Sequence, residues 1–353
     1  MPSPDALSLA DLVISHGDRW LAEIGPAVTA ADPTGSVSAQ SRLLCAGLGL
    51  LGVAAHRALG GDRRADEVGR AGAMLSLLTK IDDQIIDAPA FHGGAGNLDR
   101  EALATRTRAE IAPTLASLRD ASPASREPRA LLAADLGRAL RGLAADRSRL
   151  DRVLGTITRG WEVQVEAVRV LTSHPSRITR REVAAVTRAI SGVWLLMIAR
   201  LGELPGDARR AFTAEEEDAF LAWGWDIQRA DAIADLAKDL GDGHLSSWPG
   251  LLLWERAPEA YLAAAERGDV AAIYALLHAH EVDLDCLPTA AERAARDARL
   301  GDLGEVRSLL AFIHAYLVRR YLAHPACARR EAGAAPAFGA RLFPAREASC
   351  SAR

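Results

Sequence analysis

The stretch from residue 231 to residue 239, Asp231-Ala-Ile-Ala-Asp235-Leu-Ala-Lys238-Asp239, repeats aspartate at intervals of four residues. An α-helix has about 3.6 residues per turn, so this spacing places the three carboxylates in one stripe along a helix face. Apolar residues on both sides predict a helix over residues 213–240, which opens with a capping-box pattern. Taken alone, the stripe fits an exposed acidic face paired with Lys238 and Arg229 as well as it fits a binding site.

A second acidic run, Asp82-Asp83-Gln-Ile-Ile-Asp87, closes an apolar helix predicted over residues 64–87. Asp83 and Asp87 share one helix face, and Asp82 lies on the adjoining edge. Like charges four residues apart repel each other and weaken a helix that has no counter-ion. A divalent cation, which prefers hard oxygen ligands, would remove that penalty. A solvated acidic helix end is the alternative for this run by itself.

The two acidic runs lie about 150 residues apart. Helical bundles build metal sites from inward side chains on facing helices. Mg2+ in proteins is held by one or two carboxylates and completes its shell with water and substrate phosphates. The pair of runs therefore predicts a magnesium site for a substrate that carries a diphosphate. Its candidate ligands are Asp82, Asp83, Asp87, Asp231, Asp235 and Asp239.

The rest of the chain shows helical periodicity and almost no strand-like alternation, which predicts an all-α fold. Further helices are predicted over residues 37–59, 99–121, 127–145, 147–173, 179–201, 256–266, 269–281, 288–299 and 303–323, with a loop over 88–96. No repeat or linker divides residues 1–324, so we expect one domain there. Residues 325–353 are rich in Ala, Arg, Pro and Gly, and we expect them to form a disordered tail.

The composition argues against several classes of function. The formal net charge is -4 and Lys and Arg are not clustered, which disfavours nucleic-acid binding. The N-terminus lacks the pattern of a signal peptide, and no apolar stretch reaches the ~20 residues that cross a bilayer. The cysteines form no CxxC pair and no Cys/His zinc pattern. We therefore expect a soluble, cytoplasmic protein without a membrane span.

The two acidic runs resemble the metal-binding motifs of class I terpene synthases, which have the single-domain helical bundle of the isoprenoid synthase superfamily. Residues 82–87 are similar to the first aspartate-rich motif. The family's second motif, Asn-Asp-x-x-Ser-x-x-x-Glu, binds magnesium through its first, fifth and ninth positions, which are Asp231, Asp235 and Asp239 here. Lys238 and the Gly-Asp-Gly-His of residues 241–244 also match, whereas aspartate replaces Asn, Ser and Glu.

Two further pairs of residues support the resemblance. Family members carry a diphosphate-sensing Arg and, four residues later, a Gly that breaks its helix; Arg188 and Gly192 match this pair. Close helix packing is the alternative role for Gly192. An Arg-Tyr pair on the family's last core helix is matched by Arg320 and Tyr321. The resemblance covers residues 82–321 and is weak over residues 1–70.

The resemblance implies a Mg2+-dependent terpene cyclase, a carbon-oxygen lyase that acts on farnesyl or geranylgeranyl diphosphate. Two Mg2+ ions would bind Asp82, Asp83 and Asp87, and a third would bind Asp231, Asp235 and Asp239. Hydrogen bonds to the departing diphosphate would come from Arg188, Lys238, Arg320 and Tyr321. The allylic cation would cyclise in an apolar pocket with Trp161, Trp194 and Phe220 as candidate lining. The resemblance also makes a homodimer an expectation.

Three alternatives remain open. Squalene and phytoene synthases, which couple two prenyl diphosphates, also place aspartates four residues apart after a glutamine, and Gln228 with residues 231–239 matches that pattern. Elongating prenyl diphosphate synthases resemble residues 41–87, but the following Ala88-Pro-Ala-Phe-His-Gly-Gly lacks the basic residues that would hold isopentenyl diphosphate, which disfavours elongation. The third alternative is a non-catalytic helical protein with a degraded site.

Overall fold

All regular secondary structure in the described part of the chain is helical, which confirms the all-α prediction. The computed structural model describes residues 4–88, 91, 99–301 and 303–324. In chain order the helices are α1 (Pro4–Ala31), α2 (Ala39–Gly47), α3 (Gly49–Ala58), α4 (Ala65–Asp87), α5 (Arg100–Asp120), α6 (Pro128–Leu143), α7 (Arg147–Leu171), the 3-10 turn η1 (Pro175–Arg177), α8 (Arg180–Arg200), η2 (Leu201–Glu203), α9 (Ala214–Ala234), α10 (Leu236–Gly241), α11 (Trp248–Arg256), α12 (Pro258–Glu266), α13 (Val270–Ala279), α14 (Val282–Asp285), α15 (Ala290–Ala298) and α16 (Gly304–Leu322).

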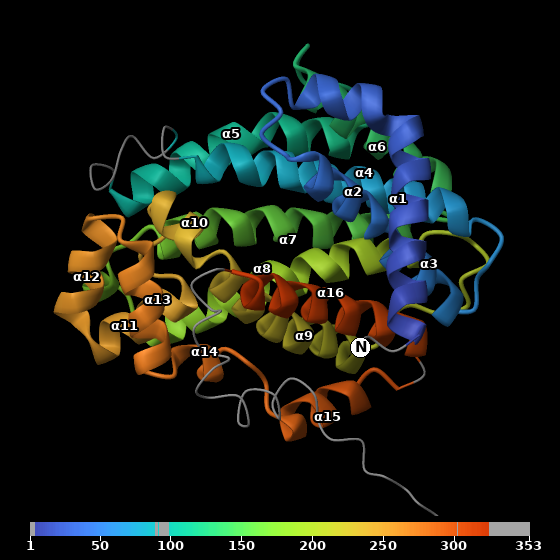
Figure 1. Ribbon diagram of the computed structural model, residues 1–353. Coiled ribbons are helices and arrows are strands. Elements are labelled where there is room, and N and C mark those ends of the chain that lie inside the picture. Colours follow the sequence, from blue (N-terminus) through green and yellow to red (C-terminus); the bar gives the residue numbers. More distant parts are fainter. Residues whose placement is uncertain (1–3, 89–90, 92–98, 302, 325–353) are drawn as a thin grey trace, which may run out of the picture.

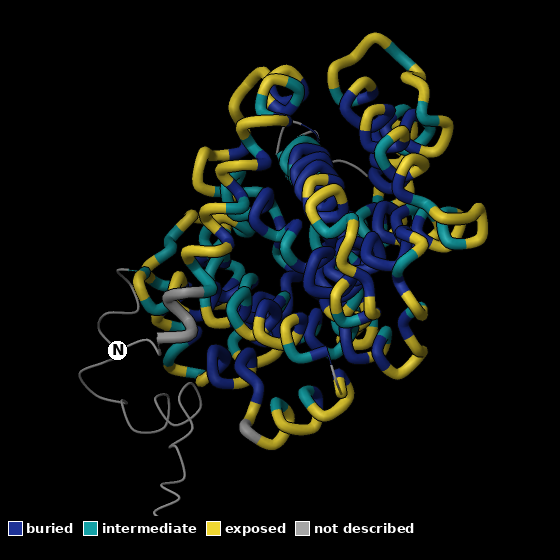
Figure 2. The backbone as a smooth tube through the Cα atoms, turned by 90° about the vertical axis from the view of Figure 1, so that its right-hand side faces the viewer, coloured by how far each residue is buried: buried dark blue, intermediate teal, exposed yellow. Residues whose placement is uncertain are grey.

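The long helices form a bundle around α8 (Figure 1). Helix α8 packs against α7 on one side and α9 on the other, and α16 lies against α9 and α3. Helices α5 and α6 pair with each other along one edge, where α6 contacts α4. The short helices α11 to α14 gather at one end of the bundle, beside α10. Buried segments lie in the middle of the molecule and exposed residues on its outside (Figure 2), so the bundle encloses one apolar core.

Helix α8 contains a long apolar segment. The segment Arg180–Glu203 is the one candidate membrane span in the described chain, judged by length and composition only. Within its most apolar window, 61% of the residues are buried against neighbouring helices. A helix that is apolar on all sides is also what the core of a large bundle requires. Packing at the centre of this bundle therefore accounts for the composition of α8.

Most predicted helices are present with bounds shifted by one or two residues, and two predictions were wrong. The helix predicted over residues 37–59 divides at Leu48, between two glycines, into α2 and α3. The helix predicted over residues 213–240 divides at Asp235 into α9 and α10. Helices α1, α11 and α14 were not predicted. The predicted tail 325–353 and most of the predicted loop 88–96 lie outside the described residues.

Candidate functional site

The first acidic run lies at the C-terminal end of α4. Asp83 is partly buried and accepts a hydrogen bond from the Lys80 ammonium at 2.6 Å. Asp87 is the last residue of α4, and its Oδ1 lies 3.7 Å from Nε2 of His244. Because His244 follows α10 in the chain, this contact places the end of α4 beside the second acidic run.

The second acidic run crosses a bend between α9 and α10. Asp235 forms the bend, with φ -103° and ψ 7°. The Asp235 N–H still donates to the Asp231 carbonyl at 2.8 Å, and the Asp239 N–H donates to the Asp235 carbonyl at 2.8 Å. Backbone hydrogen bonds therefore link Asp231 to Asp235 and Asp235 to Asp239 across the bend, which keeps the three aspartates near one another.

The two acidic runs are close enough to change each other's protonation. The pKa of Asp231 is raised to about 7 by burial and by the carboxylates of Asp235 and Asp83. Burial and Asp83 raise the pKa of Asp87 well above its usual range. Burial and the surrounding carboxylates, Asp87 among them, raise the pKa of Asp239. Such mutual effects require short distances between charges. The structure thus gathers five of the six predicted ligands, Asp83, Asp87, Asp231, Asp235 and Asp239, which we call the aspartate group.

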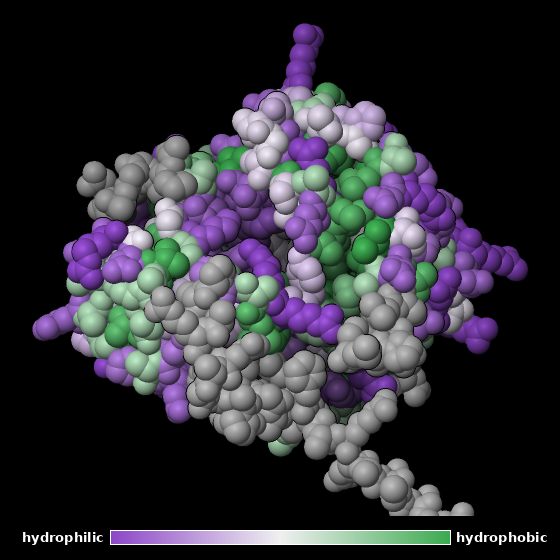
Figure 3. Space-filling view, in the orientation of Figure 1, coloured by the Kyte–Doolittle hydropathy of each residue, from purple (hydrophilic) through white to green (hydrophobic). Residues whose placement is uncertain are grey.

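The surface is hollowed between α4 and α16 (Figure 3). Hydrophilic residues border this hollow on the side of α10 and the end of α4, and hydrophobic residues border the opposite side. A cleft with one charged wall and one apolar wall suits an amphipathic substrate, since the charged wall can hold a polar head and the apolar wall a hydrocarbon chain.

The aspartate group fits Mg2+ in its chemistry. Carboxylate oxygens are the hard ligands that Mg2+ prefers, and a divalent cation would relieve the repulsion that raises these pKa values. Within the described part of the chain, no three His, Cys, Asp or Glu side chains already form a metal-binding group. Two of the carboxylates form ion pairs with basic side chains instead: Asp83 pairs with Lys80, and Asp235 pairs with Arg320. Metal binding requires these two basic side chains to release their carboxylates.

Lys80 is the site residue that the sequence analysis missed. Burial lowers its pKa, but the Asp83 carboxylate raises it more, so the Lys80 pKa lies above its usual value and the ammonium stays charged. Its charge also lowers the pKa values of Asp87 and Asp231. The sequence contained a signal for this residue. Lys80 lies three residues before Asp83, and side chains at this spacing meet on one face of a helix.

Two predicted basic residues lie beside the aspartate group. Arg320 reaches it from α16 through its ion pair with Asp235. Lys238 pairs with Asp242 at 2.7 Å, and its charge lowers the pKa values of Asp87 and Asp239. Both side chains are partly exposed, 45% for Arg320 and 42% for Lys238, so both can move toward a bound anion.

Asp82 does not join the aspartate group, contrary to its predicted place among the ligands. Its side chain is buried and points toward α6 and α7, where it accepts hydrogen bonds from Arg129 at 2.9 Å and from the Trp161 indole at 3.0 Å. Asp82 is therefore a buried structural carboxylate in this conformation, although it adjoins Asp83 in the chain.

Gly192 does not break its helix, so that prediction was wrong. Helix α8 is continuous from Arg180 to Arg200, and its backbone meets α9 at Gly192 and Gly224. A Cβ atom on Gly224 would overlap the backbone nitrogen and Cα of Gly192, and a Cβ on Gly192 would lie 2.9 Å from the Cα of Leu221. The alternative interpretation, close helix packing, describes this glycine.

Arg188 and Gln228 lie near the same crossing of α8 and α9. The Arg188 side chain is exposed on α8. One turn later, the Ser191 hydroxyl donates to Oε1 of Gln228 at 2.6 Å. Gln228 precedes Asp231 by three residues on α9, so this bond fixes the side chain next to the second acidic run. The diphosphate-sensing role of Arg188 stays a prediction.

Tyr321 lies away from the aspartate group, contrary to its predicted place beside the diphosphate. The side chain is buried, and its hydroxyl donates to Asp283 at 3.0 Å and lies 3.0 Å from Nε2 of His278. Of the aromatic candidates for a pocket lining, Trp161 and Phe220 are buried in the core, and Trp194 is half-buried.

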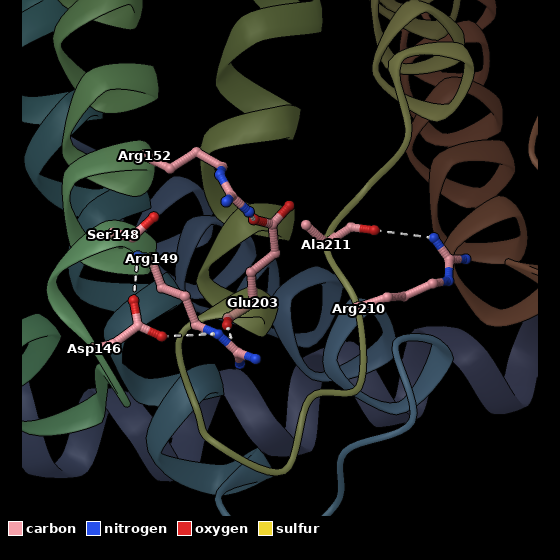
Figure 4. Close-up of a pocket in the computed structure, with 7 residues that line it drawn as sticks. All are labelled: Asp146, Ser148, Arg149, Arg152, Glu203, Arg210 and Ala211. Carbon is pink, nitrogen blue, oxygen red and sulfur yellow. Dashed lines mark hydrogen bonds and ion pairs between the residues drawn. The ribbon is translucent and has the colours of Figure 1, made fainter.

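A separate polar cavity of about 350 Å³ lies at the start of α7 (Figure 4), lined by Asp146, Ser148, Arg149, Arg152, Glu203, Arg210 and Ala211. Its arginines are engaged by the protein itself. Arg149 donates to the carbonyls of Glu203 and Pro205, Arg152 pairs with Glu203 at 3.1 Å, and Arg210 points away toward Glu216. None of the aspartate group lines this cavity, which therefore offers no comparable chemistry.

Comparison with protein-family models finds no match to this chain, and comparison with curated proteins finds none either.

Proposed function

We propose that this protein is a Mg2+-dependent enzyme that ionises a prenyl diphosphate. The observation that carries the proposal is the aspartate group itself: the contact of Asp87 with His244 brings the end of α4 beside the second acidic run, and burial together with neighbouring carboxylates raises the pKa values of its members. A solvated acidic face would keep its carboxylates exposed, whereas all five carboxylates of the aspartate group are partly buried. The neighbouring cleft, with one hydrophilic and one hydrophobic side, suits a substrate with a diphosphate head and a hydrocarbon tail.

In this proposal the aspartate oxygens hold Mg2+, and bound Mg2+ supplies positive charge to the diphosphate leaving group. Lys80 and Arg320, released from Asp83 and Asp235, donate hydrogen bonds to the diphosphate oxygens together with Lys238. The bond between carbon and the diphosphate oxygen then breaks, and its electron pair leaves with the diphosphate. An allylic cation remains beside the hydrophobic side of the cleft, and its formation requires no nucleophilic side chain.

Cyclisation of that cation to a terpene hydrocarbon or alcohol is the fate that the sequence resemblance favours. Coupling of two prenyl diphosphates is the second candidate, and two observations support it. Gln228 is held beside Asp231 by Ser191, and glutamine at this position belongs to the coupling pattern. Helix α8 runs unbroken through Gly192, whereas a break there belongs to the cyclase pattern. We consider coupling the fate that the site geometry supports better.

Incubation with geranyl, farnesyl or geranylgeranyl diphosphate, each with Mg2+, tests both fates. Hydrocarbon extracts are read by gas chromatography–mass spectrometry, with an EDTA-treated sample as control. A product of doubled carbon count supports coupling, and a cyclic product of unchanged carbon count supports cyclisation. If no product forms and isothermal titration shows no binding of Mg2+ with inorganic diphosphate, the chain is the non-catalytic helical protein. Size-exclusion chromatography with light scattering tests the expected homodimer, and cell fractionation tests the expected cytoplasmic location.

A further inference from the structure

A partly buried ionic cluster adjoins the aspartate group without belonging to it. Asp82 is only 2% exposed, and each of its two carboxylate oxygens has a partner. Oδ1 accepts from Arg129 at 2.9 Å and Oδ2 accepts from the Trp161 indole at 3.0 Å. Arg129 also donates to Glu110 at 2.5 Å. We call Asp82, Glu110, Arg129 and Trp161 the clasp.

The clasp joins four helices, since Asp82 belongs to α4, Glu110 to α5, Arg129 to α6 and Trp161 to α7. Hydrogen bonds between buried charged groups are short and directional, whereas contacts between apolar side chains tolerate small rotations. The apolar residues of α4, such as Leu77, Leu78 and Ile81, bury this helix without defining its rotation as strictly.

The rotation of α4 decides where the neighbouring aspartates point. Successive residues of a helix are separated by about 100° around its axis, so Asp83 lies about 100° from Asp82 and Asp87 about 140° from it. While Asp82 points toward α6 and α7, Asp83 and Asp87 must point to another side of α4. That side carries their contacts with Lys80 and with His244 beyond α10.

We propose that Asp82 is a positioning residue, which acts with Arg129 and Trp161 to fix the rotation of α4 so that Asp83 and Asp87 face the second acidic run. This inference rests on the proposed function, because the quantity that it controls is metal binding by the aspartate group. It replaces the expectation that Asp82 is itself a ligand, and it assigns Arg129 and Trp161 a part in metal binding although neither belongs to the aspartate group.

A double-mutant cycle on the full-length protein tests this role. The variants are Asp82→Asn, Arg129→Gln and their combination, and the probe is Mn2+ with inorganic diphosphate, measured by isothermal titration. We expect each single variant to weaken Mn2+ binding about tenfold or more, and the combination to be no weaker than the worse single variant, because both substitutions disable one unit. Asp32→Asn is the matched control, since Asp32 is equally buried and pairs with Arg42 away from the site. It should lower the melting temperature and leave Mn2+ binding unchanged.

If Arg129→Gln does not fold, Trp161→Phe removes a single hydrogen bond to Asp82 and should still weaken Mn2+ binding. Loss of binding in Asp82→Asn with wild-type binding in the folded Arg129 and Trp161 variants would show that Asp82 is a ligand and overturn the proposal. Wild-type binding in all folded variants would overturn it as well. If the wild-type protein binds neither Mn2+ nor diphosphate, the proposed function fails first and this inference fails with it.

Discussion

The Lys80 ammonium lies 2.6 Å from the Asp83 carboxylate and influences the charges of both acidic runs. Lys80 therefore acts as a counter-ion that the chain supplies to its own carboxylates. A metal ion that binds Asp83 has to compete with it.

Removal of this counter-ion should strengthen metal binding in the absence of diphosphate. We expect Lys80→Met to raise the affinity for Mn2+ alone by about tenfold or more, because a unit charge a few ångströms away contributes at least ~1.4 kcal/mol near a protein surface. Free Mn2+ is measured by electron paramagnetic resonance. Lys238→Met serves for comparison and should have a smaller effect, since Lys238 influences Asp87 and Asp239 but pairs directly with Asp242. Equal Mn2+ affinity in wild type and Lys80→Met would contradict this prediction.

Asp239 and Asp242 are three residues apart and should differ in their effect on catalysis. Asp239 belongs to the aspartate group, whereas Asp242 pairs with Lys238. We expect Asp239→Asn to lower turnover by about two orders of magnitude or more, since in the proposed mechanism it removes a ligand of the Mg2+ that offsets the charge of the departing diphosphate. Asp242→Asn should keep most of the activity. Turnover is followed by diphosphate release, and circular dichroism shows whether both variants are folded. Similar activities in the two variants would refute the assignment of Asp239.

The metal-free protein should lose stability as the pH rises through the raised pKa of Asp231. The folded-state pKa is about 7 against an ordinary value of 3.8, so between these values the folded state binds more protons than the unfolded state. The free energy of unfolding then falls as the pH increases over this window. Asn at this position carries no charge. The melting temperature of Asp231→Asn minus that of wild type should therefore increase from pH 5 to pH 8 in EDTA. A difference that is constant with pH would contradict the raised pKa.

The contact between Gly192 and Gly224 should tolerate no side chain. We expect Gly224→Ala to lower the free energy of unfolding by about 1–3 kcal/mol, because the added methyl overlaps the Gly192 backbone. Gly155→Ala is the matched control: Gly155 lies in the exposed middle of α7 with no atom within 4 Å of an added Cβ. Alanine there should stabilise the protein by about 0.5–1 kcal/mol through helix propensity. Urea unfolding measures both variants, and equal effects would show that the crossing is looser than described.

The sequence predicted helices where local signals were strong. Helix α8 begins at a capping box formed by Thr179 and Glu182, and α9 at one formed by Thr213 and Glu216, close to their predicted starts. The division at Leu48 had a visible signal in its flanking glycines. The bend at Asp235 had none, because no Gly or Pro is present. The bend lies among the like charges of α9 and α10. Asp235 also pairs there with Arg320, which is 85 residues later in the chain.

The sequence predicted which residues could form the candidate site, but it did not predict the directions in which their side chains point. Aspartates at intervals of four residues indicated which faces carry charge, and the structure brings those faces together. Which of the adjacent residues Asp82 and Asp83 faces the second run depends on Arg129, which is 47 residues away in the chain. The position of Tyr321 likewise depends on Asp283 and His278. Such partners belong to tertiary packing, and the spacing of residues within one helix does not contain them.

The crossing at Gly192 and Gly224 also has a mechanical consequence. No side chain separates the two backbones there, so no rotamer change can absorb a displacement of α8. A shift of α8 is passed directly to α9, which carries Asp231 two turns after Gly224. The position of the second acidic run is therefore tied to that of α8 through this backbone contact.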